Sequence, residues 1–326
     1  TDGGTTWLIQ TSGTTNTLND VCFCNVNTGW IVGMNGSILK TTNGGATWIN
    51  QTYDVTCSYF SVYFIDSNTG WAVGANSTYN PIIIKTTDGG SSWVNQPIGL
   101  SNSLMNSMYF VDSNTGWVVG SNGIIIKTTD GGTTWVSQTS GINNNLNSVY
   151  FSDVNTGWAV GNDGIILTTY NGGINWIGQV SGTTNVLKSV YFSDSNNGWT
   201  VGISGIILKT IDGGITWESK ISGTTNFLNG VHFSDVNTGW VVGANGIILK
   251  TTDGGTNFIS QSIGTANALK SIYCADLNNE WAVGMSGTIR KTSDSGLSWE
   301  NQTSGTTNIL NGVHFSDVNT GWAVGM

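Results

Sequence analysis

Two aromatic positions recur along the chain at a nearly constant interval, and this repeat limits the folds that are open to it. The segment 112–135, DSNTGWVVGSNGIIIKTTDGGTTW, contains one copy of each position, Trp117 and Trp135. Successive copies of the first position are 41 residues apart, except for one step of 46. A fixed period of this length is typical of repeat architectures. The first position is held by Trp30, Trp71, Trp117, Trp158, Trp199, Trp240, Trp281 and Trp322, and the second by Trp7, Trp48, Trp93, Trp135, Trp176, Trp217, Phe258 and Trp299.

Each repeat divides into four short segments with the composition of β-strands. In one copy we predict strands over residues 146–152, 158–161, 165–169 and 174–179, separated by turns of Asn, Asp and Gly. Glycine and β-branched residues interrupt every window that is long enough for a helix. Four antiparallel strands in about 41 residues are typical of one blade of a β-propeller. The sequence therefore predicts an all-β fold, a β-propeller of four-stranded antiparallel blades with the tryptophans packed between blades.

The repeat begins and ends out of phase, which bears on the number of blades. Residues 1–10 resemble a fourth strand alone, seven full units follow, and residues 311–326 supply a first and a second strand. Closing the circle leaves it seven residues short of a full period, which is the length of a third strand with its turn. We expect a single domain over residues 1–326 with eight blades, the last one split between the termini; the alternative is seven blades. Either the sequence is a piece of a longer protein, or a neighbouring copy or a partner donates the strand.

Composition argues against several classes of partner. The net charge is -9, there is one arginine, Arg290, and no basic run exists, so nucleic acid is not an expected partner. No apolar run approaches the ~18 residues of a membrane-spanning helix. The cysteines at 22, 24, 57 and 274 lack the spacing of a metal site, and we expect them to be small core or surface residues. Only 9% of the residues are charged, and the surface rich in Asn, Thr and Gly suggests an extracellular or cell-surface location.

The segments 86–93 (TTDGGSSW), 128–135 (TTDGGTTW) and 251–258 (TTDGGTNF) resemble the Asp-box of bacterial neuraminidase repeats. Together with the preceding GW-VG segment, the pattern is similar to the propeller family of photosystem II stability and assembly factors and their secreted bacterial relatives. The resemblance covers the whole chain and implies that the Asp of the box has a structural role, folding back onto its own turn. That family presents a basic patch to its partner, and this chain has too few cations to copy it. The box position is held by Asp2, Asp88, Asp130, Asp212, Asp253 and Asp294.

The acidic residues that lie outside the repeat pattern give little support for catalysis. A glycosidase needs two carboxylates that face one cleft, and Asp20 with Asp54, on neighbouring blades, is the candidate pair. A sialidase would need an arginine cluster for the carboxylate of its substrate, which one arginine cannot supply. The D-x-N-x-G turns lack the last carboxylate of a calcium loop, so we expect no metal and no other cofactor, with Ca²⁺ as the weaker alternative. The acids outside the pattern are Asp20, Asp54, Asp163, Glu218, Glu280 and Glu300.

The regular repeat is broken in one place. The loop 75–81 between a second and a third strand is longer than its counterparts, and the preceding connection 53–60 has a different sequence. In a propeller these two kinds of segment share one face, and binding residues commonly lie on variable loops of a rigid scaffold. Neutral drift in a tolerant loop is the alternative interpretation. We predict a binding site for a protein or a glycan formed by Tyr53, Asp54, Tyr59, Tyr79 and Asn80.

These features predict a non-enzymatic propeller that acts as a binding or structural module outside the cell or at its surface. A glycoside hydrolase of the Asp-box propeller type is the second hypothesis. An assembly factor for a membrane protein complex, implied by the family resemblance, is the third. Self-assembly through the incomplete blade is a further hypothesis about partners.

Overall fold

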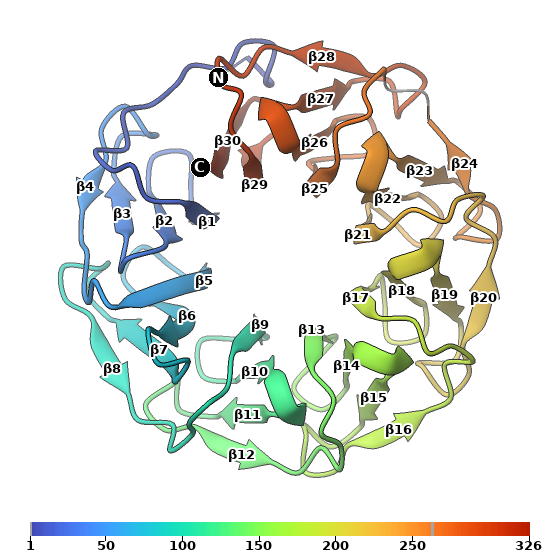
Figure 1. Ribbon diagram of the computed structural model, residues 1–326, viewed down its shortest axis with the longest axis horizontal. Helices are drawn as coiled ribbons and strands as arrows, with labels where there is room; N and C mark the ends of the chain where they lie inside the picture. Colours follow the sequence, from blue (N-terminus) through green and yellow to red (C-terminus); the bar gives the residue numbers. More distant parts are fainter. Residues whose placement is uncertain (1, 262–263) are drawn as a thin grey trace.

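The computed structural model describes residues 2–261 and 264–326 and forms a closed ring of β-sheets (Figure 1). Seven sheets contain four antiparallel strands each, and an eighth sheet contains two. Within each four-stranded sheet the strands follow one another in chain order from the inside of the ring to its outside. This up-and-down order is that of a propeller blade, so the predicted all-β propeller is confirmed.

The strands are numbered in chain order, and each complete blade takes four of them. Blades 1 to 3 consist of β1 (Leu18–Phe23), β2 (Gly29–Gly33), β3 (Ile38–Thr41), β4 (Ile49–Asn50), β5 (Cys57–Phe64), β6 (Gly70–Asn76), β7 (Pro81–Thr86), β8 (Val94–Gln96), β9 (Met105–Phe110), β10 (Gly116–Gly120), β11 (Ile125–Thr128) and β12 (Val136–Gln138). Blades 4 and 5 consist of β13 (Leu146–Phe151), β14 (Gly157–Gly161), β15 (Ile166–Thr169), β16 (Ile177–Gln179), β17 (Leu187–Phe192), β18 (Gly198–Gly202), β19 (Ile207–Thr210) and β20 (Glu218–Lys220). Blades 6 and 7 consist of β21 (Leu228–Phe233), β22 (Gly239–Gly243), β23 (Ile248–Thr251), β24 (Ile259–Ser260), β25 (Leu269–Cys274), β26 (Glu280–Gly284), β27 (Ile289–Thr292) and β28 (Glu300–Gln302).

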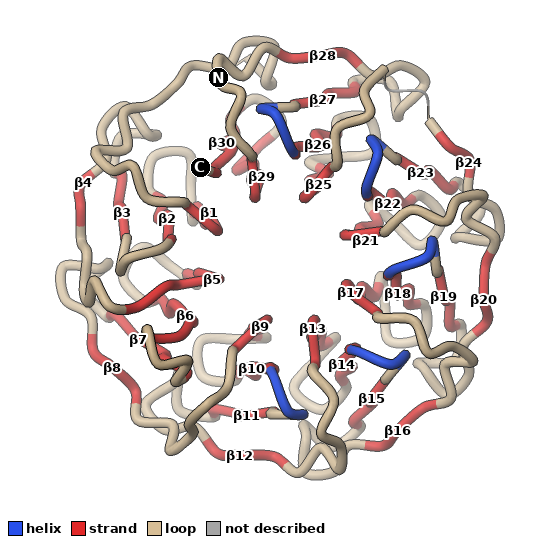
Figure 2. Tube along the Cα trace, viewed as in Figure 1, coloured by secondary structure: helices blue, strands red, loops and turns tan. Residues whose placement is uncertain are grey.

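Short 3₁₀ turns join the second strand to the third in blades 3 to 7, and they lie on the same face as the connections between blades (Figure 2). We call this face the connection face, and the opposite face, which carries the Asp-boxes, the box face. Blades 1 and 2 have no 3₁₀ turn at this point. The turns are η1 (Ser121–Gly123), η2 (Asn162–Gly164), η3 (Ile203–Gly205), η4 (Ala244–Gly246) and η5 (Met285–Gly287).

The eighth sheet, β29 (Leu310–Asp317) and β30 (Thr320–Gly325), closes the ring between blades 7 and 1. On one side, Asn311 Nδ2 donates a hydrogen bond to the Leu18 carbonyl (3.0 Å), as Asn147 Nδ2 does to Leu187 (2.8 Å) between blades 4 and 5. The N-terminal Asp-box lies against the turn of the eighth sheet, where the Gly3 N–H donates to the Asn319 carbonyl (2.9 Å), and on the other side Trp281 Nε1 of blade 7 donates to the Gly3 carbonyl (3.2 Å). The N-terminal and the C-terminal segments of the chain therefore meet in the same sector of the ring.

Within residues 2–261 and 264–326 the structure has seven complete blades, which fits the seven-blade alternative, and the eighth sheet has two strands. The expected fourth strand over residues 1–10 is wrong: residues 2–10 are not a strand, and Thr1 lies outside the described residues. The physical reason is that the eighth sheet holds no third strand whose backbone groups a fourth strand could pair with. The 28 strands of the seven complete blades match the predicted order of four per repeat.

The tryptophans of the first position fasten each blade to the next. Trp158 of β14 is fully buried and stacks on Phe192 of blade 5 with the ring centroids 3.5 Å apart. Its Nε1 donates a hydrogen bond to the carbonyl of Gly213 in the Asp-box of blade 5 (2.9 Å). The second-position Trp217 meets Phe192 edge-on at 6.0 Å. One repeat unit therefore buries its apolar surface only when a neighbouring unit packs against it, as the interval between the tryptophans predicts.

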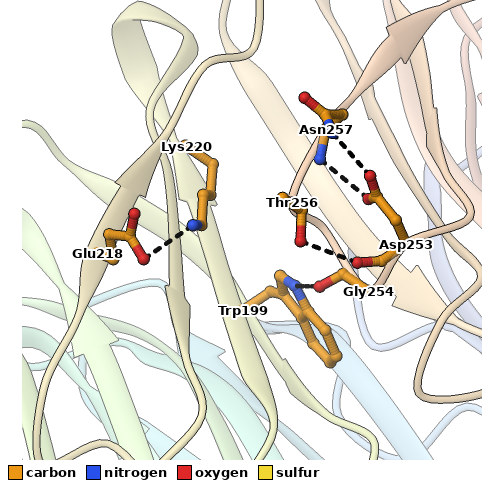
Figure 3. Close-up of polar contacts among 7 residues, drawn as sticks. All are labelled: Trp199, Glu218, Lys220, Asp253, Gly254, Thr256 and Asn257. Atoms are coloured by element: carbon orange, nitrogen blue, oxygen red, sulfur yellow. Dashed lines mark hydrogen bonds and ion pairs between the residues drawn. The ribbon is translucent and has the colours of Figure 1, made fainter.

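Each box with an aspartate closes its own turn with a carboxylate, whereas Asn43 and Asn171 do so with an amide oxygen in blades 1 and 4. Figure 3 shows the box of blade 6. Asp253 accepts hydrogen bonds from the backbone N–H of Asn257 (2.9 Å) and from its Nδ2 (2.8 Å). The neighbouring Gly254 carbonyl receives the bond from Trp199 Nε1 (3.2 Å). The two hydrogen bonds from Asn257 favour the ionised carboxylate and hold the pKa of Asp253 at about 2. The geometry agrees with the structural role implied for the Asp of the box.

Candidate functional site

The predicted binding residues of the first irregular connection lie on the connection face beside blade 1. The Tyr53 side chain is exposed, and Asp54 accepts hydrogen bonds from the Thr56 N–H (2.9 Å) and Oγ1 (2.8 Å). The backbone hydrogen bond from Thr56 holds the pKa of Asp54 below its usual value. The carbonyl of Asp54 is so close to the β2–β3 turn that a Cβ on Gly36 would lie 2.2 Å from it. Contact with the β2–β3 turn therefore holds the connection between β4 and β5 in place.

The second irregular loop, between β6 and β7, presents an exposed tyrosine on a fixed backbone. Asn76 Oδ1 accepts hydrogen bonds from the N–H groups of Thr78 (3.0 Å) and Asn80 (3.0 Å). The Tyr79 carbonyl accepts from the Ser103 N–H (2.9 Å) of the next connection, and the side chain of Tyr79 is 68% exposed. Tyr79 has a φ of 59°, in the left-handed region that β-carbon-bearing residues seldom adopt, and these bonds maintain it.

Tyr59 is a correction to the predicted site, because its side chain is 0% exposed and cannot contact a partner. It packs between blades with Trp30, Val62 and Ile84, and burial raises the pKa of its hydroxyl. The cause is the early start of β5 at Cys57, which takes Tyr59 into the sheet at the place that Leu146 holds in blade 4. Counting back from Phe64, as from Phe151 in the regular repeat, gives this register from the sequence alone.

The four remaining residues lie on the connection face in neighbouring sectors. Asp54 contacts the turn of blade 1, whereas Tyr79 and Asn80 contact the connection to blade 3, where Asn80 Oδ1 accepts from the Asn102 N–H (3.0 Å). Within residues 2–261 and 264–326 no hydrogen bond joins the two pairs. They form a broad, discontinuous surface, which suits a macromolecular or extended ligand better than a small molecule enclosed in a pocket.

The candidate carboxylate pair does not form an acid–base site. Asp20 is held between β1 and β5, where its Oδ2 accepts hydrogen bonds from Ser61 Oγ (3.0 Å) and the Val62 N–H (3.0 Å). Burial raises the pKa of Asp20, while Asp54 stays on the connection face, bound to Thr56. A glycosidase needs both groups free and facing one substrate. Asp20 instead replaces the serine that links neighbouring blades elsewhere, as Ser107 Oγ does with the Val149 N–H (3.3 Å).

The aspartates of the D-x-N-x-G turns are engaged with their own backbone. Asp153 Oδ1 accepts hydrogen bonds from the N–H groups of Asn155 (2.7 Å) and Thr156 (3.0 Å), which is an Asx turn. No group of three or more His, Cys, Asp or Glu side chains in the described residues is arranged to hold a metal ion. The described part of the chain also contains no helix with the length and apolarity needed to cross a bilayer.

Glu280 is a buried carboxyl, which the sequence identifies only as one of the acids outside the repeat pattern. The other sheets have glycine here, with a Phe ring packed on it: a Cβ on Gly239 would lie 2.4 Å from the ring of Phe233. In blade 7, Cys274 takes the place of that phenylalanine, and the smaller side chain leaves room for Glu280, which is 0% exposed. Burial raises the pKa of Glu280 to about 8, although the Lys250 ammonium lowers it in part. The sequence NNEW in place of NTGW was the available signal.

Most of the lysines are also part of the repeat. A lysine of the third strand lies over the first-position tryptophan of its own blade, as with Lys127 over Trp117 (5.0 Å from Nζ to the ring centroid) and Lys209 over Trp199 (5.9 Å). These cation–π contacts are worth about 0.5–1 kcal/mol at partly exposed sites. The lysines placed in this way are Lys40, Lys85, Lys127, Lys209, Lys250 and Lys291.

Comparison with known proteins shows which family the chain matches. The family model described as "Photosynthesis system II assembly factor YCF48" matches residues 3–107, 98–181 and 178–265. No curated protein matches the chain. Among solved structures, "YCF48 bound to D1 peptide" is similar at 23% identity and a TM-score of 0.66, with 83% of this chain and 89% of that chain covered. YCF48 from Cyanidioschyzon merolae is similar at 20% identity and a TM-score of 0.66, with 88% and 98% covered. The computationally designed Ika8 protein has 13% identity and a TM-score of 0.79, with 98% and 100% covered.

Proposed function

Because the chain belongs to the family of photosynthesis system II assembly factor YCF48, we propose that it is a non-catalytic module that binds a segment of a partner protein. One solved relative is described as bound to a D1 peptide, which supports a peptide segment as the class of ligand. The function is then that of an assembly factor, which holds part of another protein while a complex forms. The composition of the surface supports an extracellular or cell-surface location for this activity.

The observation that carries the proposal is the exposed aromatic surface of the connection face. Tyr53 and Tyr79 are exposed on loops whose backbones are fixed by hydrogen bonds, so the loop backbones lose little further freedom on binding. Tyrosine is enriched among residues that contribute most to protein–protein affinity. The neighbouring Val55 adds exposed apolar surface. A net charge of -9 favours a neutral or cationic segment as the partner.

Joint replacement of the two tyrosines tests the site. Short random peptides displayed on phage are selected on the purified chain, and the selected peptides are measured by fluorescence anisotropy. We expect the double variant Tyr53→Ala/Tyr79→Ala to bind them at least about tenfold more weakly, because each anchor contributes on the order of 1 kcal/mol or more. Its melting temperature should stay within about 2 °C of the parent, since both residues lie on loops.

Phe227 provides a matched control, because it is an exposed aromatic residue in the connection between blades 5 and 6. Phe227→Ala should leave the affinity unchanged. Three results would contradict the proposal: no peptide is selected, the double variant binds as well as the parent, or the parent cleaves or modifies the peptides, as mass spectrometry would show.

A further inference from the structure

The Asp-boxes of blades 4 and 5 differ from those of the other blades in the side chains that they expose on the box face. In blade 3 the residue before the Asp of the box is Thr129, and the residue after its second Gly is Thr133. Blades 4 and 5 have a large apolar residue at both places. We call these four residues the apolar patch: Tyr170 and Ile174 in blade 4, and Ile211 and Ile215 in blade 5.

The apolar patch is exposed and runs from one blade to the next. The exposed fractions are 46% for Tyr170, 74% for Ile174, 68% for Ile211 and 64% for Ile215. Blades 4 and 5 are neighbours in the ring (Figure 1). Tyr170 joins their boxes, because its hydroxyl donates a hydrogen bond to the Gly213 carbonyl (3.3 Å), which lies between the two isoleucines of blade 5. An exposed cluster of large apolar side chains marks an interaction site more often than scattered ones do.

Blade 4 also lacks two charges that the repeat places close to the box face. Thr168 stands where the other complete blades have a third-strand lysine such as Lys127, and Asn171 stands where most boxes have an aspartate. Blade 1 has the second exchange, at Asn43, but it keeps its lysine, Lys40. Blade 4 is therefore the one complete blade without either charge. A charge that a partner covers loses its hydration, so the loss of both charges beside new apolar side chains favours burial of this surface.

Carboxylates surround the apolar patch. The turn between the first and second strands of blade 4 lies against the box of that blade, because the Gly172 N–H donates to the Asn155 carbonyl (2.7 Å). This turn contains the exposed Asp153, and the equivalent turn of blade 5 contains the exposed Asp194. Asp212 of the blade 5 box is the third carboxylate. A partner that covers the patch therefore meets negative charge at its edge.

The edge carboxylates are free to pair with cations of a partner. Within residues 2–261 and 264–326 none of the three forms a salt bridge. Lys127 of blade 3 comes close to the box of blade 4, but its Nζ lies over the ring of Trp117, 5.0 Å from the centroid. The net charge of the whole chain, -9, has the same sign as the edge of the patch. The charges therefore favour a partner with lysine or arginine around an apolar centre.

We infer that the box face of blades 4 and 5 binds a segment of another protein, one with an apolar face and with lysine or arginine at the edges of that face. The apolar face covers the four side chains of the patch, and the cations meet the edge carboxylates. A second copy of the chain would bring like charges together, which opposes self-association through this surface. The patch lies on the opposite face of the ring from Tyr53 and Tyr79, so the inference goes beyond the peptide-binding surface proposed above.

Two amphipathic helical peptides of about 18 residues test the inference on the intact chain. Both have leucine on one face, and the other face carries lysine in one peptide and glutamate in the other. Fluorescence anisotropy should show that the lysine peptide binds at least about tenfold more tightly, because its cations meet the edge carboxylates. Hydrogen exchange should slow in residues 170–175 and 211–216 when the lysine peptide is added.

A fourfold variant separates the patch from the general attraction of a cationic peptide to an acidic protein. Tyr170→Thr/Ile174→Thr/Ile211→Thr/Ile215→Thr gives both boxes the residues of the blade 3 box and leaves the net charge unchanged. We expect it to bind the lysine peptide at least about tenfold more weakly, because the apolar contact is lost. Its melting temperature should stay within about 2 °C of the parent, since the replaced side chains are exposed.

Leu297→Ser is the matched control. Leu297 is 89% exposed at the place in the blade 7 box that Ile174 has in blade 4, and Ser293 takes the other place there. A single exposed leucine without the rest of the patch should contribute little, so this variant should keep the affinity for the lysine peptide within about threefold of the parent.

Four results would overturn the inference. The lysine peptide fails to bind at concentrations up to about 1 mM, the lysine and glutamate peptides bind equally, or the fourfold variant binds the lysine peptide as well as the parent does. The fourth is a dimer in light scattering that the fourfold variant abolishes, which would assign the patch to a second copy of the chain. The variant Tyr53→Ala/Tyr79→Ala should bind the lysine peptide as the parent does, so failure of the connection-face surface and failure of the patch are separate outcomes.

Discussion

Replacing Trp158 with alanine is expected to lower the free energy of unfolding by about 3–5 kcal/mol. Trp158 is fully buried, stacks on Phe192 at 3.5 Å and donates a hydrogen bond to the Gly213 carbonyl (2.9 Å). The substitution leaves a cavity at the contact between blades 4 and 5 and removes a hydrogen bond that joins them. Equilibrium unfolding in denaturant, followed by tryptophan fluorescence, measures the change.

Tyr79→Ala is the control, with an expected loss below about 1 kcal/mol, because the side chain of Tyr79 is exposed on a loop. Similar losses for the two variants would show that the tryptophans of the first position do not form the contacts between blades. Separate unfolding transitions would likewise contradict the ring, since each blade depends on its neighbour for burial of its apolar face.

Raising the pH from about 4.5 to about 8 is expected to destabilise the protein through Glu280, by at most about 5 kcal/mol. The pKa of this carboxyl is raised to about 8 in the folded chain from an ordinary value of 4.5. Folding therefore favours the protonated form of Glu280. The stability that this carboxyl contributes is fully present below its ordinary pKa and is lost as the pH rises through its pKa in the folded chain. The Lys250 ammonium limits the shift by favouring the ionised form.

The double variant Cys274→Phe/Glu280→Gly restores the pair of residues found in the other blades and is expected to remove this dependence. The difference in unfolding free energy between parent and variant, measured at several pH values, isolates Glu280 from the two histidines. Burial lowers the pKa of His232 and of His314 to about 4, which gives a trend of the opposite sign below pH ~6.5 in both proteins. A difference that does not change with pH would show that Glu280 ionises normally in the folded state.

The interval between the tryptophans predicted most of the fold because each repeat must bury the same faces. The strand predicted over residues 146–152 is β13, which ends one residue earlier at Phe151, and the one over residues 158–161 is β14, which begins one residue earlier at Gly157. The fourth strand was predicted too long, over residues 174–179, because the Asp-box turn holds the chain until Trp176 and β16 begins at Ile177. Local hydrogen bonds of the turn compete there with the pairing of the sheet.

The candidate site was predictable where an insertion departs from the repeat, whereas Tyr59 was misplaced although its register follows the repeat. Tyr79 and Asn80 fall in an insertion that must leave the sheet, and the structure places them on the connection face. Tyr59 was misplaced because the changed sequence of the connection before it hides that β5 begins at Cys57, although the spacing from Phe64 is that of the regular repeat. Glu280 was seen as an acid outside the pattern, but its burial depends on the exchange of phenylalanine for Cys274 on the paired strand, a compensation between two strands.

The ring of seven four-stranded blades closed by a two-stranded sheet is the central claim, and amide hydrogen exchange of the 326-residue chain tests it most directly. Gly161 of β14 and Gly325 of β30 are equivalent residues, and the Gly161 N–H donates to the Ile165 carbonyl (3.0 Å). Ala159 and Ala323 form a second matched pair. We predict that Gly161 and Ala159 are strongly protected, while Gly325 and Ala323 exchange at rates close to those of unpaired amides and Val324 stays protected by β29. Equal protection of the two members of each pair would contradict an eighth sheet with a free edge.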